Sequence, residues 1–418
     1  MKNTIKMSLV AALAVAGLST TASAGGLEEA IKGVTISGKM EVEYDYVSDK
    51  AEGENKNTTN TWDLDWDITA KIPVNDNVTA VFGAEGDTET NIGEESINSA
   101  DQEGKDNVQV TKVYFQYANG PVTILAGKQG IGAPWFDDER ANGVVGLFNA
   151  GPVTLAAAHF TGANANTLGS NSADMYVDTA FATDMDAAVT LDDADISALA
   201  VIGSMGPVNA SLWYANIAGI TVEAGAAGAA AYFATLDADS YSLNLNATFD
   251  IVNVDVRYTS TDYDSQRDNT ATDLEGDASL LKIVASADFG VVTPYLGYGM
   301  TDNEQHLAGV DLTSDTDSVV DFGGEILSID ELADAKAWIL GVKVPVGALA
   351  LEAFYIDGDA DGVFDLDADI DYNEFYVGAD YAMSKNFTVG AHFAKAEVEI
   401  DNDTTDYVDA AVSLEYKF

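Results

Sequence analysis

Alternation of apolar and polar residues with a period of two runs along most of the chain, and it constrains the fold more than any other feature. Residues 62–69 place Trp62, Leu64 and Trp66 on one side of an extended strand, with aspartates between them on the other. Residues 251–258 and 408–418 show the same pattern. Successive side chains of a β-strand point to opposite faces, so this period predicts strands with one apolar and one polar face.

Segments of this kind give eighteen candidate strands. An even number of antiparallel strands is typical of a closed bacterial outer-membrane barrel. The candidate strands are residues 34–47, 62–72, 78–87, 108–118, 121–128, 143–150, 152–160, 196–204, 207–217, 240–250, 252–262, 278–288, 291–301, 335–345, 349–358, 370–383, 386–398 and 405–418.

The connections between these strands alternate between short turns and long loops. The long loops are rich in Asp, Asn, Thr and Gly, and they are residues 88–107, 129–142, 161–195, 218–239, 263–277, 302–334, 359–369 and 399–404. Short periplasmic turns and long extracellular loops are typical of an outer-membrane barrel, whereas a soluble sandwich does not segregate its loops so regularly. The sequence therefore predicts an all-β fold, a transmembrane antiparallel β-barrel of about 18 strands, in a single domain over residues 25–418.

The first 24 residues read as a secretory signal peptide. Lys2 and Lys6 form the positive region, residues 9–18 are apolar, and residues 22–24 (Ala-Ser-Ala) form a small-residue cleavage site. The apolar stretch is short for a membrane-spanning helix, so an anchor is the weaker interpretation. We expect export, cleavage before Gly25 and localisation to the bacterial outer membrane.

Composition excludes several functions. The chain has 19 Lys and Arg against 69 Asp and Glu, a net charge of −50, which argues against nucleic-acid binding because phosphate needs clustered basic residues. It has no cysteine, and its three histidines stand in no recognisable nucleophile motif. The sequence thus predicts a protein that is not an enzyme and requires no cofactor.

Several stretches resemble the major outer-membrane porin family of Campylobacter-type bacteria. They include Leu27-Glu28-Glu29-Ala30-Ile31-Lys32 followed by Val34-Thr35-Ile36-Ser37-Gly38, then Ala126-Gly127-Lys128-Gln129, Pro134-Trp135-Phe136-Asp137, Gly143-Val144-Val145-Gly146, Gly323-Gly324-Glu325-Ile326 and the terminal Leu414-Glu415-Tyr416-Lys417-Phe418. The resemblance implies an eighteen-strand homotrimeric porin that sits in outer-membrane lipid, passes small hydrophilic solutes and favours cations.

The resemblance also implies a constriction. In that family the third long loop folds into the lumen, and here the matching loop is Gln129 to Asn142. We predict Asp137, Asp138 and Glu139 as its constriction carboxylates, with Lys128, Arg140 and Arg257 as opposing charges. The family is also able to hold Ca²⁺ at the constriction through carboxylates, which points to Glu325 here. The closing acidic residue of the loop is replaced by Asn142, which lowers the charge of such a site.

A second acidic pattern suggests Ca²⁺ binding elsewhere. Asp357, Asp359, Asp361 and Asp365, with Gly362 between the last two, match the first three-quarters of an EF-hand loop. The bidentate glutamate expected at position twelve is Ala368. We expect this segment to lie in an extracellular loop; the alternative interpretation is a solvated acidic loop without a bound ion.

Two functional hypotheses of different class follow, and an outer-membrane hydrolase that uses His159 or His392 is kept as a third. The first is a general-diffusion porin whose acidic constriction favours cations, because charges lining the narrowest part of a pore set its selectivity. The alternative is a calcium-binding structural or adhesive surface barrel, in which the barrel serves only as an anchor for its acidic loops.

Overall fold

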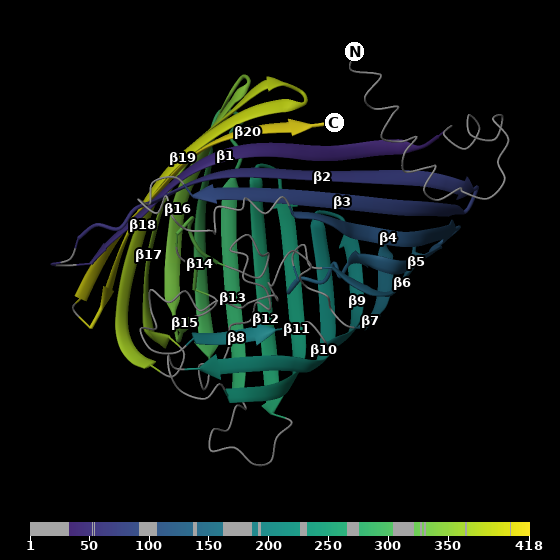
Figure 1. The fold of residues 1–418 in the computed structure, drawn as a ribbon, viewed down its shortest axis with the longest axis horizontal. Helices are drawn as coiled ribbons and strands as arrows, with labels where there is room; N and C mark the ends of the chain where they lie inside the picture. Colours follow the sequence, from purple (N-terminus) through teal and green to yellow (C-terminus); the bar gives the residue numbers. More distant parts are fainter. Residues whose placement is uncertain are drawn as a thin grey trace, which may run out of the picture.

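A computed structural model places the chain in one closed β-sheet (Figure 1). The structure describes residues 33–51, 53, 55–91, 107–136, 140–161, 186–190, 194–225, 232–265, 276–303, 322–326, 328–329, 332–363, 366–401 and 403–418. The predicted signal peptide lies outside these residues. No helix in the described part of the chain is long and apolar enough to cross a membrane.

Eighteen long strands form the barrel wall, and all eighteen predicted strands are confirmed. The wall strands are β1 (Thr35–Ala51), β2 (Thr59–Asn75), β3 (Val78–Asn91), β4 (Asn107–Asn119), β5 (Val122–Gly130), β6 (Arg140–Ala150), β7 (Val153–Thr161), β9 (Asp195–Met205), β10 (Val208–Gly225), β11 (Tyr232–Phe249), β12 (Val252–Ser265), β13 (Gly276–Ala287), β14 (Thr293–Asn303), β16 (Lys336–Val346), β17 (Leu349–Val363), β18 (Leu366–Ser384), β19 (Phe387–Ile400) and β20 (Asp403–Lys417).

Two short strands complete the sheet. β8 (Asp186–Thr190) pairs with the part of β10 that extends beyond β9, and β15 (Leu332–Ala333) pairs with the part of β17 that extends beyond β16. They supply hydrogen-bonding partners where the two wall strands stop, so the long strands β10 and β17 are not left with bare edges there.

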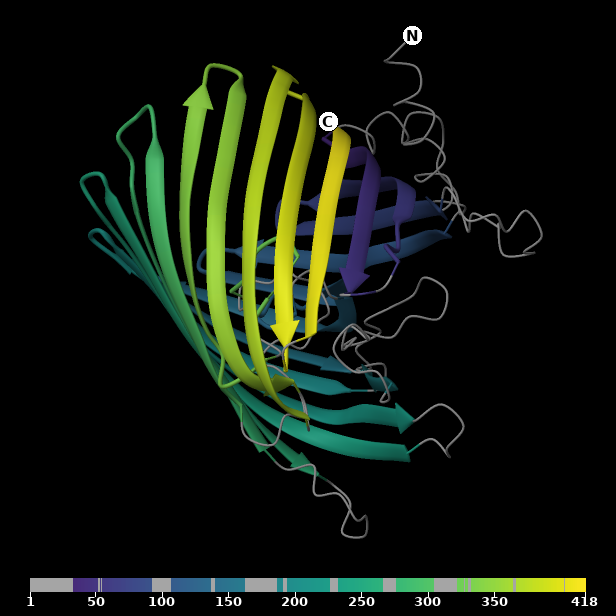
Figure 2. The same ribbon diagram turned by 90° about the vertical axis from the view of Figure 1, so that its left-hand side faces the viewer.

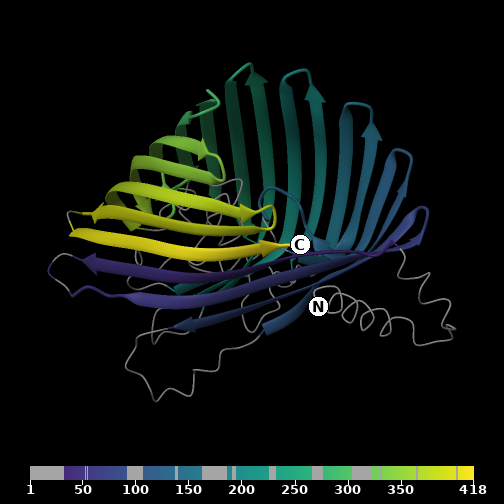
Figure 3. The same ribbon diagram turned by 90° about the horizontal axis from the view of Figure 1, so that it is seen from above.

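The barrel is closed by its first and last strands, which lie side by side in Figures 2 and 3. β1 pairs with β20 in antiparallel register from Lys39 opposite Lys417 to Ala51 opposite Thr405. The terminal Phe418 continues this ladder, since its N–H and C=O both bond to the backbone of Gly38. Closure removes the free strand edges that cannot exist in hydrocarbon.

The alternation predicted from the sequence separates two faces of the wall. Along β4, Val113, Phe115 and Tyr117 are exposed on the apolar face. The buried side chains lie on the opposite face, where Ala198 of β9 alternates with the exposed Leu199. We therefore assign the exposed apolar face to the outside of the barrel and the polar, partly filled face to the lumen.

Tight turns join the strands at one end, which we call the turn end; an example is Asp76-Asn77 between β2 and β3. The other end, the loop end, contains more strand structure than was predicted. Residues 359–369 and 399–404 were predicted as loops, but β17–β18 and β19–β20 are hairpins joined at 364–365 and 401–402. The predicted loop 218–239 is likewise mostly strand, because β10 runs to Gly225 and β11 begins at Tyr232.

Candidate functional site

The lumen wall carries an acidic patch on the adjacent strands β1, β2 and β20. Glu41 of β1 lies directly opposite Asp65 of β2 on one side and Glu415 of β20 on the other. One level nearer the loop end, Glu43 lies opposite Asp63. Like charges in direct cross-strand register destabilise a sheet. Their accumulation here indicates a role other than stability, and we call residues 41, 43, 63, 65 and 415 the acidic ladder.

Lysines accompany this ladder at its turn end. Lys39 Nζ lies 2.7 Å from Glu41 Oε2, and Lys417 Nζ lies 2.8 Å from Glu415 Oε2. Each pair links residues two apart on one strand, which share a face. The lysines therefore offset the lowest level of the ladder, while Glu43 and Asp63 stand above them.

The predicted constriction loop does pack inside the barrel over the residues that the structure describes. Trp135 and Phe136 are fully buried, and they belong to one apolar cluster with Phe160 of β7 and Ile196 of β9. We call residues 131–136 the first inner segment. Asp137, Asp138 and Glu139, predicted as constriction carboxylates, lie outside the described residues, so their role stays a prediction.

Arg140, where this loop joins β6, makes a two-pronged contact with Glu85 of β3. Its Nη1 and Nη2 atoms lie 2.7 Å from Oε1 and Oε2 of Glu85 respectively. Gln109 of β4 also donates to Glu85 Oε1, at 3.1 Å. Such a guanidinium–carboxylate fork is geometrically specific. The contact connects the base of the loop at β6 to β3, which lies three strands away in the wall.

Lys128 lies near this fork, since Arg140 and Glu85 both act electrostatically on its ammonium group. The structure thus brings two predicted opposing charges, Lys128 and Arg140, to one place. Glu85 is the functional candidate that the sequence did not single out. Its position in the alternating run of β3 marked it as lumen-facing, but no local pattern linked it to residue 140.

A second part of the chain also folds against the inner wall. Phe322 lies over Gly297 and Gly299 of β14, where an added Cβ would lie 3.0 and 2.3 Å from its ring. Ile329 and Leu332 join the same apolar cluster as the first inner segment. We call residues 322–326, 328–329 and 332–335 the second inner segment; most of these residues were predicted to lie in the long loop 302–334.

Arg257, which was predicted as an opposing basic charge, lies on β12. Lys282 of β13 is its direct cross-strand neighbour, and Asp255 on the same strand acts electrostatically on it. In strand order β12 and β13 stand about halfway round the wall from β1 and β20. Figure 3 shows these two regions on opposite sides of the barrel. The lumen is therefore acidic on one wall and locally basic on the other.

The sequence of the whole chain, residues 1–418, matches the family described as Campylobacter major outer membrane protein. The chain belongs to this family. No curated protein matches it in sequence.

Solved structures of outer-membrane porins share the fold of this family member. OccK9 (OpdG) of Pseudomonas aeruginosa has a TM-score of 0.63 at 14% identity, covering 93% of this chain and 100% of that one. A BenF-like porin from Pseudomonas fluorescens Pf-5 has a TM-score of 0.63 at 12% identity, covering 93% and 99%. OccAB1 of Acinetobacter baumannii has a TM-score of 0.61 at 12% identity, covering 92% and 97%. Family and fold together identify an outer-membrane porin.

The EF-hand-like residues are placed differently from the prediction. Asp357, Asp359 and Asp361 lie within strand β17, and Asp365 lies outside the described residues. Alternate residues of a strand are separated by almost 7 Å, so the first three cannot wrap round one ion as they would in an EF-hand loop. Calcium binding by this segment is not supported by the strand geometry.

The other two predicted metal ligands, Asn142 and Glu325, lie on different parts of the barrel. Asn142 is exposed near the start of β6, directly opposite Lys128 of β5. Glu325 lies in the second inner segment, where it approaches His392 of β19. Calcium at the constriction, for which Asn142 and Glu325 were predicted as ligands, stays a prediction.

Proposed function

We propose that this family member is a general-diffusion porin that passes small hydrophilic solutes and ions and prefers cations. The observation that supports it most strongly is the acidic ladder, in which Glu41, Asp65 and Glu415 stand side by side on three adjacent strands. A lumen lined by one sign of charge between low-dielectric walls concentrates counter-ions. The free energy for transport comes from the solute gradient, so no cofactor and no covalent chemistry is required.

The opposed walls add a second property. Carboxylates on β1, β2 and β20 face a region that carries Arg257 and Lys282, so the field across the lumen has a transverse component. A dipolar hydrophilic solute is stabilised when it aligns with such a field. An apolar solute gains no interaction energy from the field and stays in contact with water. We expect Asp137, Asp138 and Glu139 to add to the negative side, which makes the constriction selective for cations.

Single-channel recording in a planar bilayer under a KCl gradient tests this function. We expect stable conductance steps with a reversal potential favouring K⁺. Changing Asp63→Asn and Asp65→Asn together removes two charges of the ladder and lowers the K⁺ preference. The matched control is Asp76→Asn with Asp250→Asn, which removes two charges from turns at the turn end.

Three outcomes oppose the proposal in different ways. A reversal potential favouring Cl⁻ retains the porin and rejects the acidic ladder as the source of selectivity. An equal effect of the control pair rejects the ladder as well. No conductance from a folded, heat-modifiable barrel rejects the porin, and leaves the structural or adhesive surface barrel.

We further propose that three chains form a homotrimer, as the family resemblance implies. Strands β5 and β7 have only nine residues each, against nineteen in β18, so the wall is lowest on one side. Nine residues are at the lower limit for spanning a bilayer. A wall this short is covered better by contact with neighbouring barrels than by contact with lipid. Native mass spectrometry of the detergent-extracted protein checks this, and a monomeric mass contradicts it.

Export by a cleaved signal peptide completes the proposal. Intact-mass measurement of protein purified from outer membranes is expected to show a chain that begins at Gly25. A mass that includes residues 1–24 would show that the segment is retained.

A further inference from the structure

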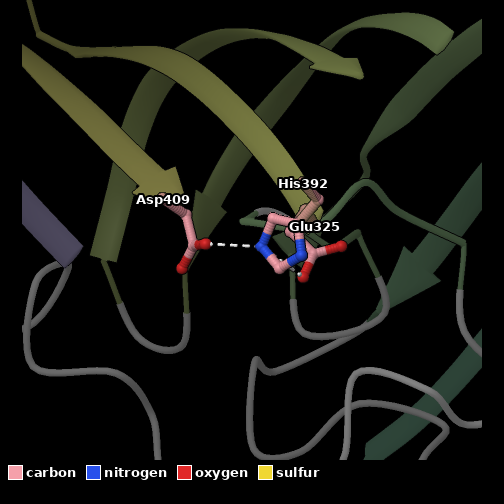
Figure 4. A group of neighbouring side chains, drawn as sticks. All are labelled: Glu325, His392 and Asp409. Carbon is pink, nitrogen blue, oxygen red and sulfur yellow. Dashed lines mark hydrogen bonds and ion pairs between the residues drawn. The ribbon is translucent and has the colours of Figure 1, made fainter. Parts of the chain in front are cut away.

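Three side chains from separate parts of the chain converge on the lumen side of the wall (Figure 4). They are Glu325 of the second inner segment, His392 of β19 and Asp409 of β20. Nε2 of His392 lies 2.7 Å from Oδ1 of Asp409 and 3.5 Å from Oε1 of Glu325. One potential ligand atom from each residue lies within 4.8 Å of the other two.

The position of Glu325 is fixed by a buried carboxylate. Glu374 of β18 is fully buried, and its two oxygens accept hydrogen bonds from the backbone N–H groups of Glu325, at 2.7 Å, and Ile326, at 3.0 Å. The turn fits so closely that a Cβ added to Gly324 would lie 2.3 Å from Glu374 Oε2. Glu374 therefore holds the segment in the orientation that directs Glu325 at the imidazole.

The imidazole is oriented as well. Tyr376 of β18 stacks against His392, with ring centroids 5.8 Å apart and an angle of 27° between the planes. Supporting contacts of this kind, which fix ligand side chains before an ion binds, are typical of metal sites in proteins.

The set of donors selects the class of ion. Ca²⁺ takes six to eight oxygen ligands, and an imidazole nitrogen is a poor substitute for one of them. One imidazole with two carboxylates suits a borderline divalent ion such as Zn²⁺, which binds nitrogen and oxygen at about 2.0–2.2 Å. The observed separations need only a small movement to enclose such an ion. Glu325 is exposed, with 37% of its side-chain surface accessible.

We propose that Glu325, His392 and Asp409 form a lumenal site for a borderline divalent cation, with Zn²⁺ as its representative. The site shares Glu325 with the calcium site that the family resemblance implies, and its ligand set differs because His392 supplies an imidazole nitrogen. The site connects the second inner segment to β19 and β20. A bound metal ion therefore fixes the position of this segment against the wall.

Equilibrium dialysis of the folded, full-length barrel in detergent against ZnCl₂, followed by metal quantification, tests the site. We expect one Zn²⁺ per chain that a large excess of CaCl₂ does not displace. His392→Gln is expected to weaken binding about tenfold or more, because changing even an outer-shell partner of a metal ligand costs about 10- to 100-fold in affinity. His159→Gln is the matched control, because His159 is a histidine of β7 that bonds Ser197 on the outer face.

Asp409→Asn provides a second variant that keeps the shape of the side chain and also weakens Zn²⁺ binding. Heat modifiability on gels verifies that each variant forms the barrel. Zn²⁺ binding unchanged by His392→Gln and Asp409→Asn overturns the proposal. Displacement of Zn²⁺ by Ca²⁺ at comparable concentration also overturns it, since that result describes unspecific binding to lumen carboxylates.

Discussion

At the scale of single residues, the fork between Arg140 and Glu85 holds two opposite charges together at the base of the constriction loop. Both side chains are about four-fifths buried, with 19% and 21% of their surface exposed. Removing one partner of such a pair leaves the other charge uncompensated in a partly desolvated place. The effect is therefore larger than that of removing an exposed charge.

We predict that Glu85→Gln reduces the preference for K⁺ by roughly a factor of two or more, because Arg140 and Lys128 then present unbalanced positive charge to passing ions. The reversal potential under a KCl gradient measures this preference. Asp76→Asn, the same charge change in an exposed turn, is expected to have little effect. The double variant Glu85→Gln, Arg140→Gln is expected to recover part of the preference, and strict additivity of the two changes would show that the pair is not coupled.

At the scale of elements, the first inner segment is held by buried aromatic rings and not by backbone pairing. Trp135 and Phe136 are fully buried against the inner wall. We predict that Trp135→Ala loosens the segment, since truncating a buried tryptophan costs about 3–5 kcal/mol. The barrel itself keeps its hydrogen-bonded ladder. Open-channel noise is expected to rise, while heat modifiability stays nearly unchanged.

Two comparison variants separate this effect from a general loss of stability. Trp135→Phe keeps most of the packing, and it loses no hydrogen bond because the buried Nε1 has no partner in the described part of the chain. It is expected to behave like the wild type. Phe115→Ala removes an exposed outward ring and is expected to leave noise unchanged. Equal noise in Trp135→Ala and Phe115→Ala would show that Trp135 does not hold the segment.

The elements also show what the sequence was able to predict. The strands were predictable wherever one face meets an apolar environment, because alternation then follows directly from the pleat. The loop ends of β17 and β18 were misread as a loop because residues 359–369 are rich in aspartate, among them Asp359 and Asp361 of β17. A strand that extends beyond the apolar band has water on both faces and needs no alternation. Strand structure there depends on hydrogen bonding to its neighbour, which no local pattern records.

The candidate sites were harder to predict for a different reason. Arg140 and Glu85 are 55 positions apart, and Glu325 approaches His392 and Asp409 only because β19 and β20 close the wall beside the second inner segment. The sequence placed Glu85, His392 and Asp409 in predicted strands, and Arg140 and Glu325 in predicted loops. It did not determine which of them meet, since that depends on the register of the whole barrel and on where two connecting segments turn inward.

At the scale of the whole molecule, selectivity is expected to depend on ionic strength. The chain carries a net charge of −50, and the ladder contributes part of it to a water-filled lumen. Mobile ions screen such a field over a Debye length of about 10 Å at 0.1 M salt and about 3 Å at 1 M. Ions that pass more than a few ångströms from the wall therefore cease to sense the ladder at high salt.

We predict that the K⁺ preference falls steadily as KCl is raised from about 0.1 M to 1 M at a fixed ratio across the bilayer. The double variant Asp63→Asn, Asp65→Asn is expected to show a weaker dependence, because it begins with less charge to screen. The pair Asp76→Asn, Asp250→Asn is expected to follow the wild-type curve. A preference that is independent of salt would instead require direct coordination of ions at a narrow filter, and the diffuse field of the acidic wall would then not be the source of selectivity.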